Sequence, residues 1–245
     1  MGYNWNWGIF FEQIKFGDET YLDWLIAALG WTIAVSITAW IIALILGSII
    51  GTVRTMPKKW LVQLGNAYVE LFRNIPLIVQ MFIWFFVVPE LLPQNLALWV
   101  KQDMPAKEFV TASIALGLFT SARIAEQVRA GIQSLSRGQG NAGLALGFTL
   151  SQTYQYVLLP MGFRIIIPPL TSEFMNVFKN SSVAFAIGVM ELTFTARQMQ
   201  EDSEQGIETY LAVTVLYFLC AFIANRVMAF IEKRSRVPGY IATAK

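Results

Sequence analysis

The longest uninterrupted apolar segment lies near the start of the chain. The thirty residues between Asp23 and Arg54 carry no formal charge. A helix needs about 20 apolar residues to cross the hydrocarbon core of a bilayer, so this segment predicts a spanning helix. Four later apolar runs are of similar length and include isolated charges. We therefore expect an all-α, polytopic membrane protein with about five transmembrane helices, at residues 25–53, 67–88, 109–130, 165–189 and 210–231.

The connections between these runs differ in their basic residues. One alternate set holds ten Lys and Arg residues, and the other holds four. The basic set is 54–66, 129–164 and 232–245, and the other set is 1–24, 89–108 and 190–209. Basic residues concentrate in short cytoplasmic loops. The pattern predicts a multi-pass protein with its N-terminus outside and its C-terminus in the cytoplasm.

Three regions follow from this reading. Residues 1–24 form an extracytoplasmic segment, residues 25–231 a transmembrane domain, and residues 232–245 a cytoplasmic tail. The first segment is rich in aromatic side chains, which suit either the membrane interface or packing against the protein itself. These side chains are Trp5, Trp7, Phe10, Phe11 and Phe16.

The composition limits the class of protein and the kinds of catalytic and metal site that the chain can form. The chain of 245 residues is 56% hydrophobic and 14% charged, whereas soluble domains carry about 25% charged residues. It contains no histidine and a single cysteine, Cys220, which excludes histidine-based acid–base catalysis and histidine-ligated metal sites. No G-x-x-x-x-G-K-[ST] motif is present to cradle ATP phosphates. We expect neither an enzyme nor a nucleic-acid partner.

Several polar residues fall inside the apolar runs. A charge at the bilayer centre costs at least about 2.5 kcal/mol, so such residues face a partner or an aqueous path. The candidates for a substrate path are Arg73, Arg123, Glu126, Glu173, Asn180 and Ser181. The planar guanidinium of Arg123 suits a bidentate grip on a carboxylate. Two alternatives remain open: Arg123 pairs permanently with Glu126 or Glu173, and Ser181 serves helix packing.

The long connection at 131–164 has its own predicted structure. Residues 139–146 suit a short helix that ends at Gly147. A second short helix begins with Thr149 or Ser151 as its cap, and Pro160 closes it. We also expect Pro168 and the proline after it to stop or bend the fourth span.

This connection resembles the EAA loop of ABC importer permeases, which reads Glu-Ala-Ala, three residues, Gly, nine residues, Ile, one residue, Leu-Pro. The matching residues here are Asn141, Ala142, Gly143, Gly147, Val157, Leu159 and Pro160. Asn141 and Gly143 depart from the usual Glu and Ala. Residues 70–80, 121–129 and 179–183 are similar to signatures of the polar amino acid branch, most of all its glutamate/aspartate members.

The resemblance implies a type I importer permease of the bacterial inner membrane, with a cytoplasmic coupling helix that contacts an ATPase. It implies two ATPase subunits, a second permease chain (the same or a different one) and an extracytoplasmic solute-binding protein. ATP and Mg would bind the ATPase, so this chain would hold no cofactor. The expected function is import of glutamate or aspartate by alternating access. Permeases for glutamine or basic amino acids, or an ATP-independent secondary transporter, are the alternatives.

Overall fold

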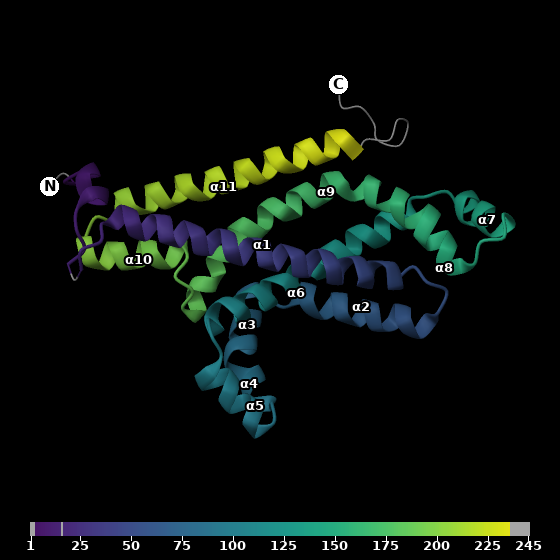
Figure 1. Ribbon diagram of the computed structural model, residues 1–245, viewed down its shortest axis with the longest axis horizontal. Helices are drawn as coiled ribbons and strands as arrows, with labels where there is room; N and C mark the ends of the chain where they lie inside the picture. Colours follow the sequence, from purple (N-terminus) through teal and green to yellow (C-terminus); the bar gives the residue numbers. More distant parts are fainter. Residues whose placement is uncertain (1–2, 16, 236–245) are drawn as a thin grey trace. The chain divides into compact units, whose positions relative to one another are not determined.

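The computed structural model describes residues 3–15 and 17–235 (Figure 1). The described residues form helices joined by short connections, and they include no strand beyond one isolated bridge between Gln13 and Thr20. Four helices are long and apolar enough to cross a membrane: α1 (Tyr21–Val53), α6 (Lys107–Gln133), the continuous stretch Leu150–Ile187, and α11 (Gly206–Ser235). A bent helix pair, Lys59–Asn74 with Leu77–Leu91, makes a fifth when the pair is counted as one span. The expected all-α polytopic class is confirmed.

The second span is not the single helix that the apolar run predicted. It consists of α2 (Lys59–Asn74) and a helical stretch from Leu77 to Leu91, bent by 104° at the break. The stretch comprises α3 (Leu77–Phe82), a π-helix (Ile83–Val87) and α4 (Val88–Leu91). The break falls at Ile75, which is extended because the following proline disfavours the helical conformation of the residue before it.

The expectation that Pro160 closes a helix was wrong, and Pro168 with the next proline does not stop the fourth span, while a bend there stays a prediction. Pro160 does not close a helix, because α8 (Leu150–Thr153) continues through a π-helix (Tyr154–Leu158) into α9 (Leu159–Asn180). In a regular α-helix the ring of Pro160 would clash with the carbonyl four residues before it. The wider π turn leaves room for that carbonyl. Pro168 and its neighbour lie inside α9, which ends only at Asn180. Membrane helices tolerate such prolines when neighbouring groups satisfy the freed carbonyls.

The chain divides into two compact units. The first comprises residues 3–40, 76–117 and 176–222, and the second comprises 41–75, 118–175 and 223–235. Each of α1, α6, α9 and α11 contributes one part to each unit. Of the predicted tail 232–245, the first four residues belong to α11, and the remainder lies outside the described residues. The predicted boundaries at 24 and 231 stay predictions.

The first unit packs α1, α10 (Leu192–Ser203) and α11 against one another, as Figure 1 shows at the N-terminal end of α1. Its buried cluster includes Tyr21, Leu25, Leu192 and Met199. The N-terminal segment forms a 3-10 helix (Trp7–Phe11) that packs Ile9 and Phe10 on this cluster. Trp5, Trp7 and Phe11 are exposed while Phe10 packs against the protein, and a place of the exposed rings at the membrane interface stays a prediction. Phe16 lies outside the described residues.

The remaining elements of the first unit are short. A helix α5 (Gln94–Leu98) and a π-helix (Trp99–Asp103) follow α4, and a 3-10 helix (Ser181–Ile187) follows α9. The last of these ends at Gly188, whose φ of +90° is a left-handed conformation that glycine adopts without strain.

In the second unit α1 packs closely on α6 through two glycines. A Cβ atom at Gly47 would stand 2.7 Å from Ile124, and one at Gly51 would stand 2.6 Å from Val128. Small residues four apart let membrane helices approach at backbone distance. A cluster of Val69, Ala122 and Ala125 continues this contact to α2.

Candidate functional site

One carboxylate in the second unit gathers three arginines. The Oε1 atom of Glu126 lies 2.8 Å from Arg54 and 3.5 Å from Arg73, and its Oε2 atom lies 3.7 Å from Arg129. These four side chains come from α6, α2 and the residue after α1. Three positive charges against one negative charge leave a net positive centre. The predicted site residues Arg73 and Glu126 are therefore in contact.

Arg54 is the buried member of this group, with a side chain only 4% exposed. It donates to Glu126 and, through Nε, to the side-chain carbonyl of Asn66 at 2.8 Å. Gly65 leaves room for it, because a Cβ there would stand 2.5 Å from the Arg54 Cγ. In the sequence, Arg54 is simply one of the basic residues of the connection 54–66. The sequence offers one weak indication of this burial, which is Gly65, because a glycine on α2 lets another side chain approach the helix closely.

The other ion pair is looser. Arg123 Nη1 lies 3.9 Å from Glu173 Oε2, and the Arg123 guanidinium lies 5.1 Å from the Phe119 ring. The side chain of Arg123 is 43% exposed and that of Glu173 is 13% exposed. Gln127 donates to Glu173 at 3.4 Å. Of the two counter-ions considered for Arg123, Glu173 is the one within ion-pair distance among the described residues.

Asn180 and Ser181 belong to the first unit, although Asn180 ends the helix that carries Glu173. Ser181 is fully buried, and its hydroxyl donates to the carbonyl of Phe178. Asn180 is half-buried and makes no side-chain capping bond. The place of both residues in a substrate path stays a prediction.

The predicted first helix, glycine turn and second cap of the long loop are present, whereas the second helix continues into α9 instead of closing at Pro160. α7 (Arg137–Ala145) ends before Gly147, which has a φ of +86°. Thr149 caps α8, since its hydroxyl accepts from the Gln152 amide while the Gln152 side chain accepts from the Thr149 amide. Such a reciprocal capping box satisfies two free donors at a helix start. Figure 1 shows α7 and α8 beside each other in the second unit.

The motif residues divide between the surface and the inside of this loop. Asn141 and Ala142 are exposed, whereas Gly143 is buried against Thr153. A Cβ at Gly143 would stand 2.9 Å from the Thr153 Cγ2, so the glycine in place of the usual alanine matches a branched neighbour. Leu159 and Pro160 begin α9. The surface between the helices is apolar, with Leu146 78% exposed and Phe148 in ring contact with Tyr156.

Tyr154 connects this loop to the end of α1. Its ring is buried, and its hydroxyl donates to the carbonyl of Thr55 at 2.8 Å. A cavity of about 390 Å³ lies beside it and is lined also by Ile132, Ser136 and Leu158. Tyr154 therefore joins the end of this loop to the turn that carries Arg54 and Thr55 toward α2.

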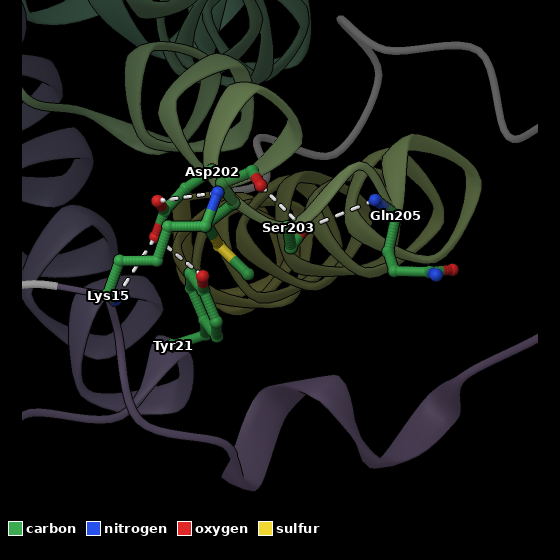
Figure 2. Close-up of polar contacts among 6 residues, drawn as sticks. Lys15, Tyr21, Asp202, Ser203 and Gln205 are labelled. Carbon is green, nitrogen blue, oxygen red and sulfur yellow. Dashed lines mark hydrogen bonds and ion pairs between the residues drawn. The ribbon is translucent and has the colours of Figure 1, made fainter.

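The first unit has a separate polar cluster at the end of α10 (Figure 2). Asp202 accepts from the Tyr21 hydroxyl at 2.6 Å and pairs with Lys15 Nζ at 3.4 Å. The Tyr21 bond, with help from Lys15, holds the pKa of the Asp202 carboxyl below its ordinary value. Figure 2 also shows Ser203 accepting from the Gln205 amide at the turn into α11. The cluster joins the N-terminal segment to α10.

The start of α10 is held by a buried acid. Glu191 is fully buried and accepts from the amides of Thr193 and Phe194 and from the Tyr217 hydroxyl. Burial raises the pKa of the Glu191 carboxyl, against the lowering effect of these donors. The sequence alone does not indicate this role, because Glu191 lies in the connection 190–209, where an acidic residue is ordinary. Among the residues the structure describes, no group of three His, Cys, Asp or Glu side chains is placed to hold a metal ion.

Comparison with known proteins decides the family. Residues 43–237 match the family of binding-protein-dependent transport system inner membrane components. The chain belongs to this family. It is 48% identical over 98% of its length, and 98% of the relative's, to the glutamate/aspartate import permease protein GltJ of Escherichia coli strain K12.

Two further comparisons agree. The permease is 29% identical to the glutamate/aspartate import permease protein GltK of Escherichia coli O6:H1, over 87% of this chain and 94% of that one. A crystal structure of an amino acid ABC transporter with histidines matches with a TM-score of 0.74 and 27% identity, over 87% of this permease and 95% of the solved chain. The expected type of protein, a multi-pass ABC importer permease, is thus confirmed.

Proposed function

We propose that this permease imports glutamate and aspartate as one membrane subunit of an ATP-driven transporter. The observation that carries the proposal is the 48% identity to GltJ over nearly the whole of both chains. The side chain of Arg123 supports it, because its guanidinium is half exposed and held in place over a ring. An acidic amino acid carries one carboxylate more than a neutral one, which such a guanidinium can bind.

The loop at 131–164 couples this transport to ATP hydrolysis on separate ATPase subunits. Its exposed apolar residues, Leu146, Phe148 and Leu150, provide a surface for a partner protein, and Tyr154 connects them to the turn after α1. ATP and Mg bind the ATPase, and the permease contributes no bond chemistry. The basic loops place this surface in the cytoplasm and the N-terminal segment outside.

The remaining partners are a second permease and an extracytoplasmic solute-binding protein. This chain resembles GltJ more than GltK, two different permeases named for the same substrates. That difference supports a heterodimer with a GltK-like chain. In the proposed cycle ATP binding draws the ATPase subunits together, the loops move, and the permease pair changes from inward-open to outward-open.

Uptake by the complete complex in proteoliposomes tests this function. The assay uses labelled glutamate, aspartate, glutamine and arginine, with the binding protein outside and ATP inside. We expect saturable uptake of glutamate and aspartate that needs ATP and persists with an uncoupler. Uptake that an uncoupler abolishes and ATP depletion leaves intact would instead indicate a secondary transporter. Preference for glutamine or arginine would overturn the substrate assignment.

A further inference from the structure

The two ion pairs of the second unit differ in tightness. Arg54 and Glu126 are 2.8 Å apart around a side chain that is nearly inaccessible, whereas Arg123 and Glu173 are 3.9 Å apart with much of the guanidinium open. An N···O separation of 3.9 Å is too long for a hydrogen bond. Glu173 therefore neutralises Arg123 without a hydrogen bond to it, while Glu126 is bonded to Arg54.

The guanidinium of Arg123 is positioned to bind a carboxylate more strongly than it binds Glu173. Its guanidinium stays over the Phe119 ring at 5.1 Å, a contact that fixes its position and leaves its edge available. An arginine edge can accept a carboxylate through two parallel N–H···O bonds, which are stronger than a long-range ion pair. A carboxylate that enters from the exposed side can thus gain two bonds that Glu173 does not make.

Glu173 has a second contact that does not involve Arg123. Its Oε1 atom accepts from the Gln127 side-chain amide at 3.4 Å, on the same helix as Arg123. Glu173 can therefore separate from Arg123 and remain hydrogen-bonded. The cost of burying it without an arginine is reduced by that amide.

We propose that Glu173 is an internal stand-in for the side-chain carboxylate of an acidic substrate, which displaces it from Arg123. The inference rests on the proposed function and deepens it, since it adds a specificity-determining residue. In the permease without substrate, Glu173 neutralises the charge of the Arg123 guanidinium, which disfavours the binding of other anions. A substrate with a second carboxylate replaces it, and a neutral amino acid does not.

Direct binding of labelled glutamate to the assembled complex in nanodiscs, without binding protein, tests this inference. If Glu173 occupies Arg123 for about nine-tenths of the time, removing its charge raises apparent affinity up to about tenfold. We expect Glu173→Gln to bind glutamate and aspartate about 5- to 10-fold more tightly and glutamine unchanged. Glu173→Asp, which withdraws the charge by one methylene, should show a smaller gain, and it serves if the first variant does not assemble.

The controls separate this inference from the proposed function. Glu201→Gln, which breaks the exposed pair of Arg197 and Glu201 at 2.8 Å, should leave glutamate affinity unchanged. Arg123→Gln should lose most of the glutamate binding. If the wild-type complex imports glutamate while Glu173→Gln binds it no more tightly, or binds glutamine more tightly by the same factor, the inference is wrong and the proposed function stands. If the wild type does not import acidic amino acids, both are wrong.

Discussion

The Tyr154 hydroxyl donates a 2.8 Å hydrogen bond to the carbonyl of Thr55, across 99 residues of chain. Tyr154 follows the short helix α8, and Thr55 follows α1. The bond gives the loop proposed to contact the ATPase a direct contact with the turn between the first two spans. Arg54, which holds Glu126 of α6, is the neighbouring residue in that turn.

Replacement of Tyr154 by phenylalanine tests this connection. The variant keeps the buried ring but leaves the Thr55 carbonyl without its donor, which costs about 1 kcal/mol. We expect ATP hydrolysis by the complex to persist while substrate transported per ATP falls. Tyr210→Phe is the matched control, because Tyr210 is 43% exposed and lies on α11, outside this loop. Equal transport per ATP in both variants would show that the bond does not take part in coupling.

Gly143→Ala tests the packing within the loop. The new methyl would meet Thr153 Cγ2 at 2.9 Å, closer than such atoms pack, so we expect a loss of about 1–3 kcal/mol. Thr153→Ser removes that methyl and should restore part of the loss. Gly140→Ala, on the same helix, has nothing within 4 Å of its new Cβ and should be neutral or stabilising by up to about 1 kcal/mol. Thermal unfolding of the wild type and these three variants measures this, and equal melting of Gly143→Ala and Gly140→Ala would contradict it.

The two ion pairs predict different costs when their acids are removed. Glu126→Ala leaves the buried Arg54 without its counter-ion, and we expect a loss of about 3–5 kcal/mol in unfolding free energy. Glu173→Ala leaves Arg123 partly in contact with solvent, so the loss should be about 1 kcal/mol or less. Denaturant unfolding of the purified complexes compares them. A larger loss for Glu173 would contradict the assignment of Glu126 as the acid that stabilises the second unit.

Glu191 predicts a pH dependence at the start of α10. Because burial raises the pKa of its carboxyl in the folded protein, the folded state holds this proton more tightly than the unfolded chain. Stability of α10 should therefore rise as the pH falls through that raised pKa, and decline above it. Hydrogen exchange of the Ala196 and Met199 amides, corrected for intrinsic rates, measures local opening between about pH 8 and about pH 5. Glu191→Gln should remove this dependence and Glu201→Gln should keep it; the reverse result would disprove it.

The sequence predicted much of this fold because its strongest signals are local. The charge-free run at 24–53 requires a long apolar helix, and Gly147 with Thr149 specifies a helix end and a helix start. A proline such as Pro76 can kink a helix, but an apolar run does not indicate the size of the bend at Ile75. The continuation through Pro160 was missed because a π turn has no recognisable sequence pattern.

The site was only partly predictable for a different reason. Arg123 and Glu126 were found because a charge in an apolar run is conspicuous. Arg54 and Glu191 lie in polar connections, where charges are ordinary, so their burial depends on contacts with residues distant in the sequence. Which acid pairs with Arg123 also depended on how α6 and α9 pack, and the sequence left that choice open.

The most direct test of the central claim replaces Arg123 by tyrosine and measures uptake by the complete complex, with its binding protein, in proteoliposomes. Labelled glutamate and glutamine are compared, together with ATP hydrolysis. We predict that glutamate uptake falls at least about tenfold, the loss expected from a bidentate carboxylate contact, while ATP hydrolysis continues. Unchanged glutamate uptake would mean that Arg123 does not bind the substrate and that selectivity resides in the binding protein or the second permease.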